Sequence, residues 1–218
     1  MLELDSGKIE LDGVDISQVP RDSIRERCFV SVAQDPLILS NETLRHNLDP
    51  GHLESDTVLV HALIKTGLQS HFGNDSFNED FSPLTSGIPD PGSHSFLDTE
   101  VSRFPALSAG QSQIFALARA LVKVKSLRSV GLQPVVLLDE VTSSVDLATE
   151  STIHEVIDEE FTNNGHTVII VAHRLSVLVG HAKPGKDIIV WMGDGRIQEV
   201  ITDVTPMILK GLSQQNNV

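Results

Sequence analysis

The chain has 218 residues, with 16 Lys and Arg against 30 Asp and Glu, which gives a formal net charge of −14 at pH 7. Such an acidic balance argues against a protein that binds nucleic acid or an anionic membrane surface. The single cysteine excludes an internal disulfide. No apolar run reaches the about 18 residues that a membrane span needs, so we expect no direct membrane insertion by this chain.

The first part of the chain is predicted to be a hairpin, a short helix and a strand. Alternating apolar and polar residues over 9–16 surround Asp12-Gly13, a typical hairpin turn. Pro20 favours the first turn of a helix. The apolar run at 28–33 then predicts a strand that is followed by Gln34.

The pattern becomes helical from Asn41. Ser55 is predicted to cap a helix that ends at Gly67. Residues 72–105 are rich in Ser, Pro, Gly, Asn and Asp, which predicts a long polar loop, and we assign no chemistry to it. A long helix is predicted to begin at Ser108. Its apolar stripe consists of Ile114, Leu117, Ala118, Leu121 and Val122.

The central stretch of the chain is an apolar strand with acidic residues at its end. The run at 135–138 is continuous and rich in β-branched residues, which is typical of a strand buried on both faces of a parallel sheet. Asp139 and Glu140 follow it directly. Ligands bind at the carboxyl ends of strands in open α/β sheets, so this pair is placed for a metal ion and a water molecule.

The remaining elements continue the alternation of helices and strands. Asp146 is predicted to cap a helix whose buried face is Ile153, Val156, Ile157 and Phe161. A second buried strand is expected over 168–172, with His173 after it. A strand over 188–192 and a turn at Asp194-Gly195 predict a further hairpin. This order predicts an α/β fold with a parallel sheet.

Five motifs occur in one order along the chain: Gln34, LSAGQ at 107–111, VVLLDE ending at Glu140, SSVD ending at Asp146, and AHR with His173. Together they resemble the Q-loop, signature motif, Walker B motif, D-loop and H-loop of the nucleotide-binding domain of ATP-binding cassette (ABC) transporters. The stretches ETLRHNLDP, ALARAL and DEVTSSVDLATE are similar to the second such domain of the multidrug-resistance-protein branch, subfamily C.

This resemblance implies a P-loop NTPase-like fold in which the whole chain is a single domain. The α/β core would comprise about 1–40 and 123–205, and an inserted helical subdomain would comprise about 41–122, including the polar loop. Residues 213–218 would form a polar tail.

The resemblance also implies ATP and Mg²⁺ as cofactors and assigns residues to them. Asp139 and Gln34 would hold Mg²⁺, and Glu140 would act as general base on the attacking water. His173 would bind the γ-phosphate and orient that base, and Gln34 would also sense the attacking water. Without the other motifs, Gln34 would be better explained as a turn residue and His173 as a satisfied histidine at a strand end.

The signature motif implies a partner. Ser108, Ala109, Gly110 and Gln111 would bind the γ-phosphate of ATP held by a second nucleotide-binding domain, because these domains dimerise head to tail. Asp146 would lie in the same interface. Ser108 and Asp146 are also ordinary helix caps, and the two interpretations are compatible.

The family's phosphate loop, G-x-x-x-x-G-K-[ST], is missing before the first hairpin. Gly7-Lys8 lacks the first glycine and the hydroxyl residue, and the similar spacing at 180–187 lies in the wrong structural context. The first core strand and the helix after the loop are missing too, so we expect an N-terminally truncated domain. Weak ATP binding by the isolated chain and an uncovered apolar surface should follow.

Three functions remain open at this point. The first is a C-terminal piece of an exporter's ATPase domain, held at the cytoplasmic face of a membrane by transmembrane domains that contact the solute. The second is a catalytically silent module that pairs with another nucleotide-binding domain. The third is a soluble cassette ATPase of DNA repair or translation. The repair type needs a long coiled coil, for which Gln34 and Ser108 are too close in sequence, and the acidic charge also disfavours this class.

Overall fold

The computed structural model describes residues 4, 6–72, 95–143, 145–172, 182–205 and 207–208. It divides into two compact units, Met1–Ile170 and Val171–Val218. This division into two units does not test the predicted single domain with an α/β core and a helical subdomain, which stays a prediction.

The first unit opens with the predicted hairpin. Strand β1 (Glu10–Leu11) pairs antiparallel with β2 (Val14–Asp15). Asp12 and Gly13 form the turn. Their φ values are 50° and 78°, so both residues lie in the left-handed region that two-residue hairpin turns use. A 3₁₀ turn, η1 (Ile16–Gln18), a short helix, α1 (Arg21–Ser23), and a π-helical turn, η2 (Ile24–Cys28), follow. Pro20 is the N-cap of α1, so the helix predicted after it is confirmed.

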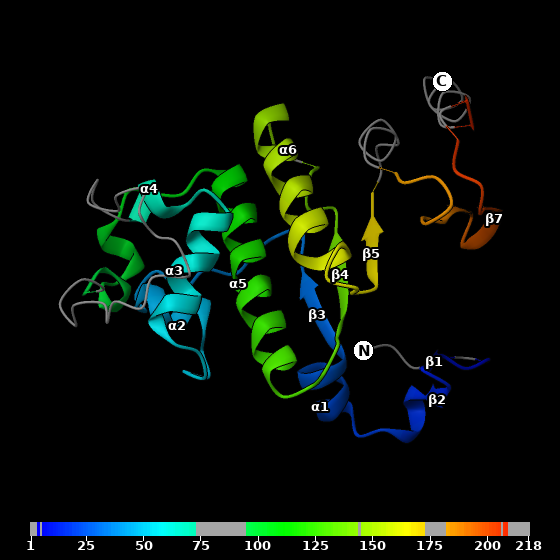
Figure 1. Ribbon diagram of the computed structural model, residues 1–218, viewed down its shortest axis with the longest axis horizontal. Coiled ribbons are helices and arrows are strands. Elements are labelled where there is room, and N and C mark those ends of the chain that lie inside the picture. The colour runs from blue at the N-terminus through cyan, green and yellow to red at the C-terminus, as the bar shows by residue number, and fades with distance from the viewer. Residues whose placement is uncertain are drawn as a thin grey trace. The chain divides into compact units, whose positions relative to one another are not determined.

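A three-stranded sheet forms the centre of this unit (Figure 1). Its strands are β3 (Phe29–Val32), β4 (Val135–Asp139) and β5 (Val168–Val171), in the order β3-β4-β5. β3 and β4 are parallel, with Phe29 opposite Val135 and Val32 opposite Leu138. Figure 1 shows all three arrows pointing the same way. The carboxyl ends of these strands therefore lie along one edge of the sheet.

Helices cover one side of the sheet. The long helix α5 (Ala109–Ser129) contacts β3, and α6 (Leu147–Val156), continued by the π-helical turn η5 (Ile157–Thr162), contacts α5. The helical part packs on α5. It contains α2 (Leu44–Leu48), α3 (Asp56–Lys65), α4 (Gln69–Phe72) and the 3₁₀ turns η3 (Ser95–Asp98) and η4 (Val101–Arg103). Residues 73–94 of the predicted polar loop lie outside the described part, whereas its end is folded into η3 and η4.

The predicted apolar stripes form the core. Every stripe residue predicted for α5 is buried, as is the predicted face of the helix that follows Asp146. In β4, Val136 and Leu138 are fully buried, and Val135 is buried on the opposite face. These helices and the central strand are confirmed, because their apolar spacing matched the surfaces that the fold brings together.

The prediction of a second fully buried strand was wrong for β5. Ile169 and Val171 are 50% and 51% exposed, while Val168 and Ile170 are half-buried and face the core. An apolar run specifies a strand, but neighbouring elements decide how many of its faces are covered. This strand therefore carries exposed apolar side chains, whereas the truncation from which such a surface was expected stays a prediction.

The second unit contains the predicted C-terminal hairpin. β6 (Ile189–Gly193) pairs antiparallel with β7 (Arg196–Ile201) around Asp194-Gly195, with a register shift between Trp191 and Met192. Ile201 and Val204 are its buried centre. Across the described ranges of both units, no helix combines the length and the apolarity that crossing a bilayer requires.

Candidate functional site

Two strand tips meet at the carboxyl edge of the sheet. Gln34 lies two residues beyond β3, and Glu140 follows Asp139, the last residue of β4. The Gln34 Nε2 donates a hydrogen bond of 2.9 Å to the Glu140 Oε2, across 106 residues of sequence. Two of the predicted site residues are therefore in direct contact, and their roles stay predictions.

The backbone at Glu140 is unusual. Its φ is 50°, in the left-handed region that non-glycine residues rarely adopt. The Glu140 carbonyl accepts a 3.0 Å hydrogen bond from the Ser143 N–H, which closes a turn directly after β4. Strained backbone of this kind concentrates at functional sites, where the surrounding structure holds it in place. The Glu140 side chain is half-buried and that of Asp139 is exposed.

Ser108 begins α5 as predicted, through a capping box with Gln111. The Gln111 N–H donates to the Ser108 Oγ at 3.1 Å, and the Ser108 N–H donates to the Gln111 Oε1 at 2.9 Å. Ala109 and Gly110 occupy the first turn of the helix. A helix start of this kind presents N–H groups and the positive end of the helix dipole to an anion.

Asp146 begins α6 in a similar way. Its carboxylate accepts 3.0 Å hydrogen bonds from the Ala148 and Thr149 N–H groups and a 2.8 Å hydrogen bond from the Thr149 hydroxyl. The hydrogen bonds from Thr149, backbone first, lower the pKa of Asp146, because they favour the charged carboxylate. The predicted helix cap is confirmed.

The two helix starts are in close contact. A Cβ added to Gly110 would lie 3.2 Å from the Thr149 Cγ2 and 3.4 Å from its Oγ1. This separation is tighter than ordinary van der Waals contact, so a glycine at this position lets α5 approach α6 closely. Thr149 therefore contacts both the signature turn and the Asp146 cap.

Gln113 is a site residue that the sequence analysis did not assign. It is buried in the second turn of α5, and its Nε2 donates to the backbone carbonyl of Gln34. The available signal was a polar amide directly beside the apolar stripe of a buried helix, where a hydrogen-bond partner is required.

The predicted magnesium ligands have suitable chemistry. Asp139 and Gln34 supply carboxylate and amide oxygens, which are the donors that Mg²⁺ prefers, and Mg²⁺ is commonly held by one or two such groups together with substrate phosphates. In the described part of the chain, no cluster of three or more His, Cys, Asp or Glu side chains could hold a metal ion.

The predicted phosphate ligand His173 lies outside the described residues, as does Ser144 of the SSVD motif. The contribution of His173 therefore stays a prediction.

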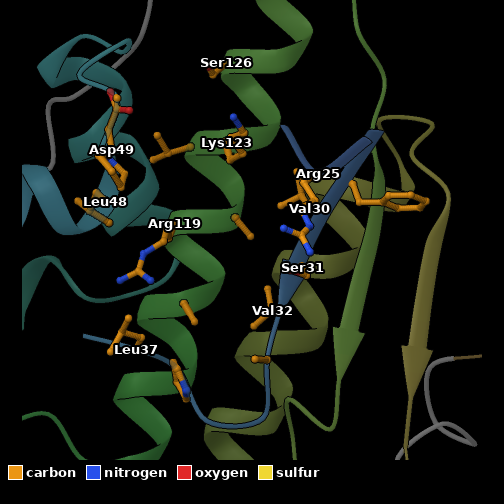
Figure 2. A pocket seen from close by; sticks show the side chains of 18 of the residues that line it. Arg25, Val30, Ser31, Val32, Leu37, Leu48, Asp49, Arg119, Lys123 and Ser126 are labelled. Atoms are coloured by element: carbon orange, nitrogen blue, oxygen red, sulfur yellow. The ribbon is translucent and has the colours of Figure 1, made fainter. Parts of the chain in front are cut away.

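A cleft of about 540 Å³ lies beside the site, between β3, the loop after Leu48 and α5 (Figure 2). Its lining is mostly apolar and includes Asp35, Pro36 and Leu37, which follow Gln34. Gln34 itself, Glu140 and Ser108 do not line it, so the cleft is distinct from the strand tips.

Arg119 lines the same cleft, and Figure 2 shows it extending from α5 on the side of α2. Its Nε donates to the Asn47 carbonyl at 2.6 Å. Burial lowers the pKa of Arg119. The hydrogen bond from Arg119 to the Asn47 carbonyl holds α2 to α5 within the first unit.

A parallel sheet with an amide and a carboxylate in contact at adjacent strand tips is the arrangement expected of a P-loop NTPase-type ATP-binding domain. The family model described as "ABC transporter" matches residues 1–143. The chain belongs to this family, which confirms the predicted fold class.

Curated relatives agree with the family. The chain is 34% identical over 199 residues to ABC multidrug transporter B of Aspergillus fumigatus, a match that covers 91% of this chain and 11% of the relative. It is 33% identical over 204 residues to the pleiotropic ABC efflux transporter of multiple drugs YBT1 of Candida glabrata, covering 91% and 11%. Multidrug resistance protein mrp-7 of Caenorhabditis elegans is 34% identical over 181 residues, covering 83% and 10%. The chain thus spans about a tenth of the length of these relatives.

Proposed function

We propose that this chain is part of the second nucleotide-binding domain of a subfamily C exporter, and that it couples ATP binding and hydrolysis to solute transport. The hydrogen bond between Gln34 and Glu140 carries the proposal, because it joins the predicted water-sensing amide to the predicted base. The multidrug transporters among the relatives support the transport part. In such a protein this domain lies at the cytoplasmic face of a membrane, attached to transmembrane domains.

Glu140 acts as the general base in this proposal. Its carboxylate accepts the proton of a water molecule that attacks the γ-phosphate, and the bond from Gln34 fixes the orientation of that carboxylate. Asp139, with Gln34, holds Mg²⁺, which neutralises charge on the phosphate oxygens when it is bound. His173 binds the γ-phosphate and orients Glu140.

The start of α5 serves a second nucleotide site. Ser108, Ala109, Gly110 and Gln111 present the helix start to the γ-phosphate of ATP bound to a partner domain, in a head-to-tail dimer. The capping box fixes this turn before any nucleotide arrives, so little ordering cost remains for binding. Asp146 lies in the same interface.

A complementation assay tests this function in trans. The chain is mixed with a nucleotide-binding domain from a related exporter that keeps its own phosphate loop but has an inactivated signature serine. We expect ATP hydrolysis above the sum of the two separate proteins, because Ser108 to Gln111 complete the partner's site. By itself, the chain should bind ATP more weakly than 1 mM, about −4 kcal/mol, because the printed sequence has no phosphate loop.

Matched variants make the assay specific. Ser108→Arg should abolish the gain, because it places a bulky cation at the helix start. Ser129→Arg makes the same change in the last residue of α5 and should keep the gain. Sub-millimolar ATP affinity of the isolated chain would contradict the role given to the missing loop, and an unchanged gain in Ser108→Arg would contradict the signature assignment.

A catalytically silent module that pairs with another nucleotide-binding domain is the second candidate. The two candidates differ at Glu140. If the chain is part of an active ATPase, Glu140→Gln in a transporter that contains this sequence removes hydrolysis at the site, whereas a silent module loses nothing. Hydrolysis measured in membrane vesicles at saturating ATP separates the two outcomes.

A further inference from the structure

Gln113 is a buried polar side chain in the helix that begins at Ser108. It is 6% exposed and lies between the first turn of α5 and the apolar stripe. An amide costs free energy to bury unless it is hydrogen-bonded. Its place in the core therefore requires a specific partner.

That partner is the backbone of the Q-loop. The Gln113 Nε2 donates to the Gln34 carbonyl, 79 residues away in sequence. The Gln113 Oε1 is buried and has no hydrogen-bond partner among the described residues. An amide rotated by 180° would place its oxygen against the Gln34 carbonyl oxygen, so only the donating orientation is favourable.

Gln34 is thus held at both ends. Its carbonyl accepts from Gln113, and its side-chain Nε2 donates to the Glu140 Oε2 at 2.9 Å. Because Gln34 lies two residues beyond β3, the pairing of β3 with β4 stops before it. The bond from α5 therefore fixes a backbone position that the sheet leaves unfixed.

We propose that Gln113 is a positioning residue that holds Gln34 in reach of Glu140. It lies five residues after Ser108, about 7.5 Å along a rigid helix axis, so a shift of the helix start also shifts Gln113. The helix that binds one nucleotide through Ser108 thereby sets the orientation of the carboxylate at the other site. This consequence for hydrolysis depends on the proposed function, whereas the positioning of Gln34 does not.

NMR of the full 218-residue chain, labelled with ¹⁵N, tests the positioning directly. The side-chain amide signals of Gln34 are assigned by their loss in Gln34→Met. Gln113→Met removes the amide at similar length, and Gln113→Asn keeps an amide that is one methylene too short. In both variants, the Gln34 signals should move to the positions that they take in Glu140→Ala. Their exchange with solvent should accelerate about fivefold, the factor that corresponds to one ordinary hydrogen bond.

Gln133→Met is the matched control. The Gln133 Nε2 also donates to a backbone carbonyl, that of Gly165, but outside this site. This variant should leave the Gln34 signals in place. The proposal is overturned if those signals stay unchanged in a folded Gln113 variant, or if Gln133→Met moves them equally. If Gln113→Met does not fold, the Gln34 signals in Gln113→Asn decide the outcome. A failure of the complementation assay leaves this readout unaffected, so the two proposals can fail separately.

Discussion

The neighbouring strands β4 and β5 have the same kind of sequence and different surroundings. Both are unbroken apolar runs in one sheet. Leu138 in β4 is 1% exposed, whereas Ile169 in β5 is 50% exposed. The run that is covered on both faces is the one that ends in Asp139 and Glu140. The strand that carries these acidic residues is therefore held by packing on both faces. One face of β5 is apolar and exposed, so another segment or protein could pack against it.

The largest effect should come from equal truncations in the two strands. Leu138→Ala removes a fully buried side chain and should lower the free energy of unfolding by about 2–5 kcal/mol, through lost burial and a cavity. Ile169→Ala should cost less than about 1 kcal/mol, because half of that side chain already contacts solvent. Urea unfolding with unchanged m-values gives both numbers. Equal losses would mean that β5 is covered as completely as β4.

A smaller effect should come from the start of the helix that covers the sheet. Ser108→Ala removes the capping box of α5 and should cost about 1 kcal/mol. Ser112→Ala, inside the same helix, is the control and should be neutral or slightly stabilising, because alanine has the higher helix propensity. Thermal unfolding of both variants measures how much stability is lost with this cap. A loss in Ser112→Ala that matches the loss in Ser108→Ala would contradict the capping box.

The cap of α6 should add a pH-dependent contribution. Hydrogen bonds from Thr149 and Ala148 lower the pKa of Asp146 below its ordinary value of 3.8. The folded state therefore binds this proton less readily than the unfolded state, and the contribution is present above pH 3.8. It is lost as the pH falls through the lower pKa of the folded state. Asp146→Asn should be less stable than the parent at neutral pH, and the gap should narrow below pH 3.8. A gap that stays constant in acid unfolding curves would contradict this linkage.

The smallest effect on stability is expected on the open face of β5. Ile169→Thr keeps a β-branched side chain, so the free energy of unfolding should change by less than about 1 kcal/mol. Aggregation should decrease, because exposed apolar strand surface promotes association. Light scattering at increasing protein concentration measures it. Leu137→Thr in β4, where the side chain is half-buried, is the comparison and should be more costly.

Much of the fold followed from local patterns. Ser108 and Asp146 were predicted as helix caps because their side chains satisfy the N–H groups of the first turn, a requirement that sequence alone shows. The contact between Gln34 and Glu140 agrees with parallel strands that end at one edge of the sheet, although the sequence analysis gave these residues roles only through the family resemblance. The exposure of β5 was not predictable from its own residues, since burial depends on what lies against a strand. Gln113 was missed because periodicity marks a buried position and does not identify the carbonyl that it contacts.

The backbone of Glu140 has a consequence for natural variation at this position. Holding a glutamate at a φ of 50° costs about 1–3 kcal/mol, which glycine would largely avoid. A population of variants sorted only for heat tolerance should therefore enrich glycine at residue 140. A population sorted for the proposed ATP hydrolysis should retain glutamate.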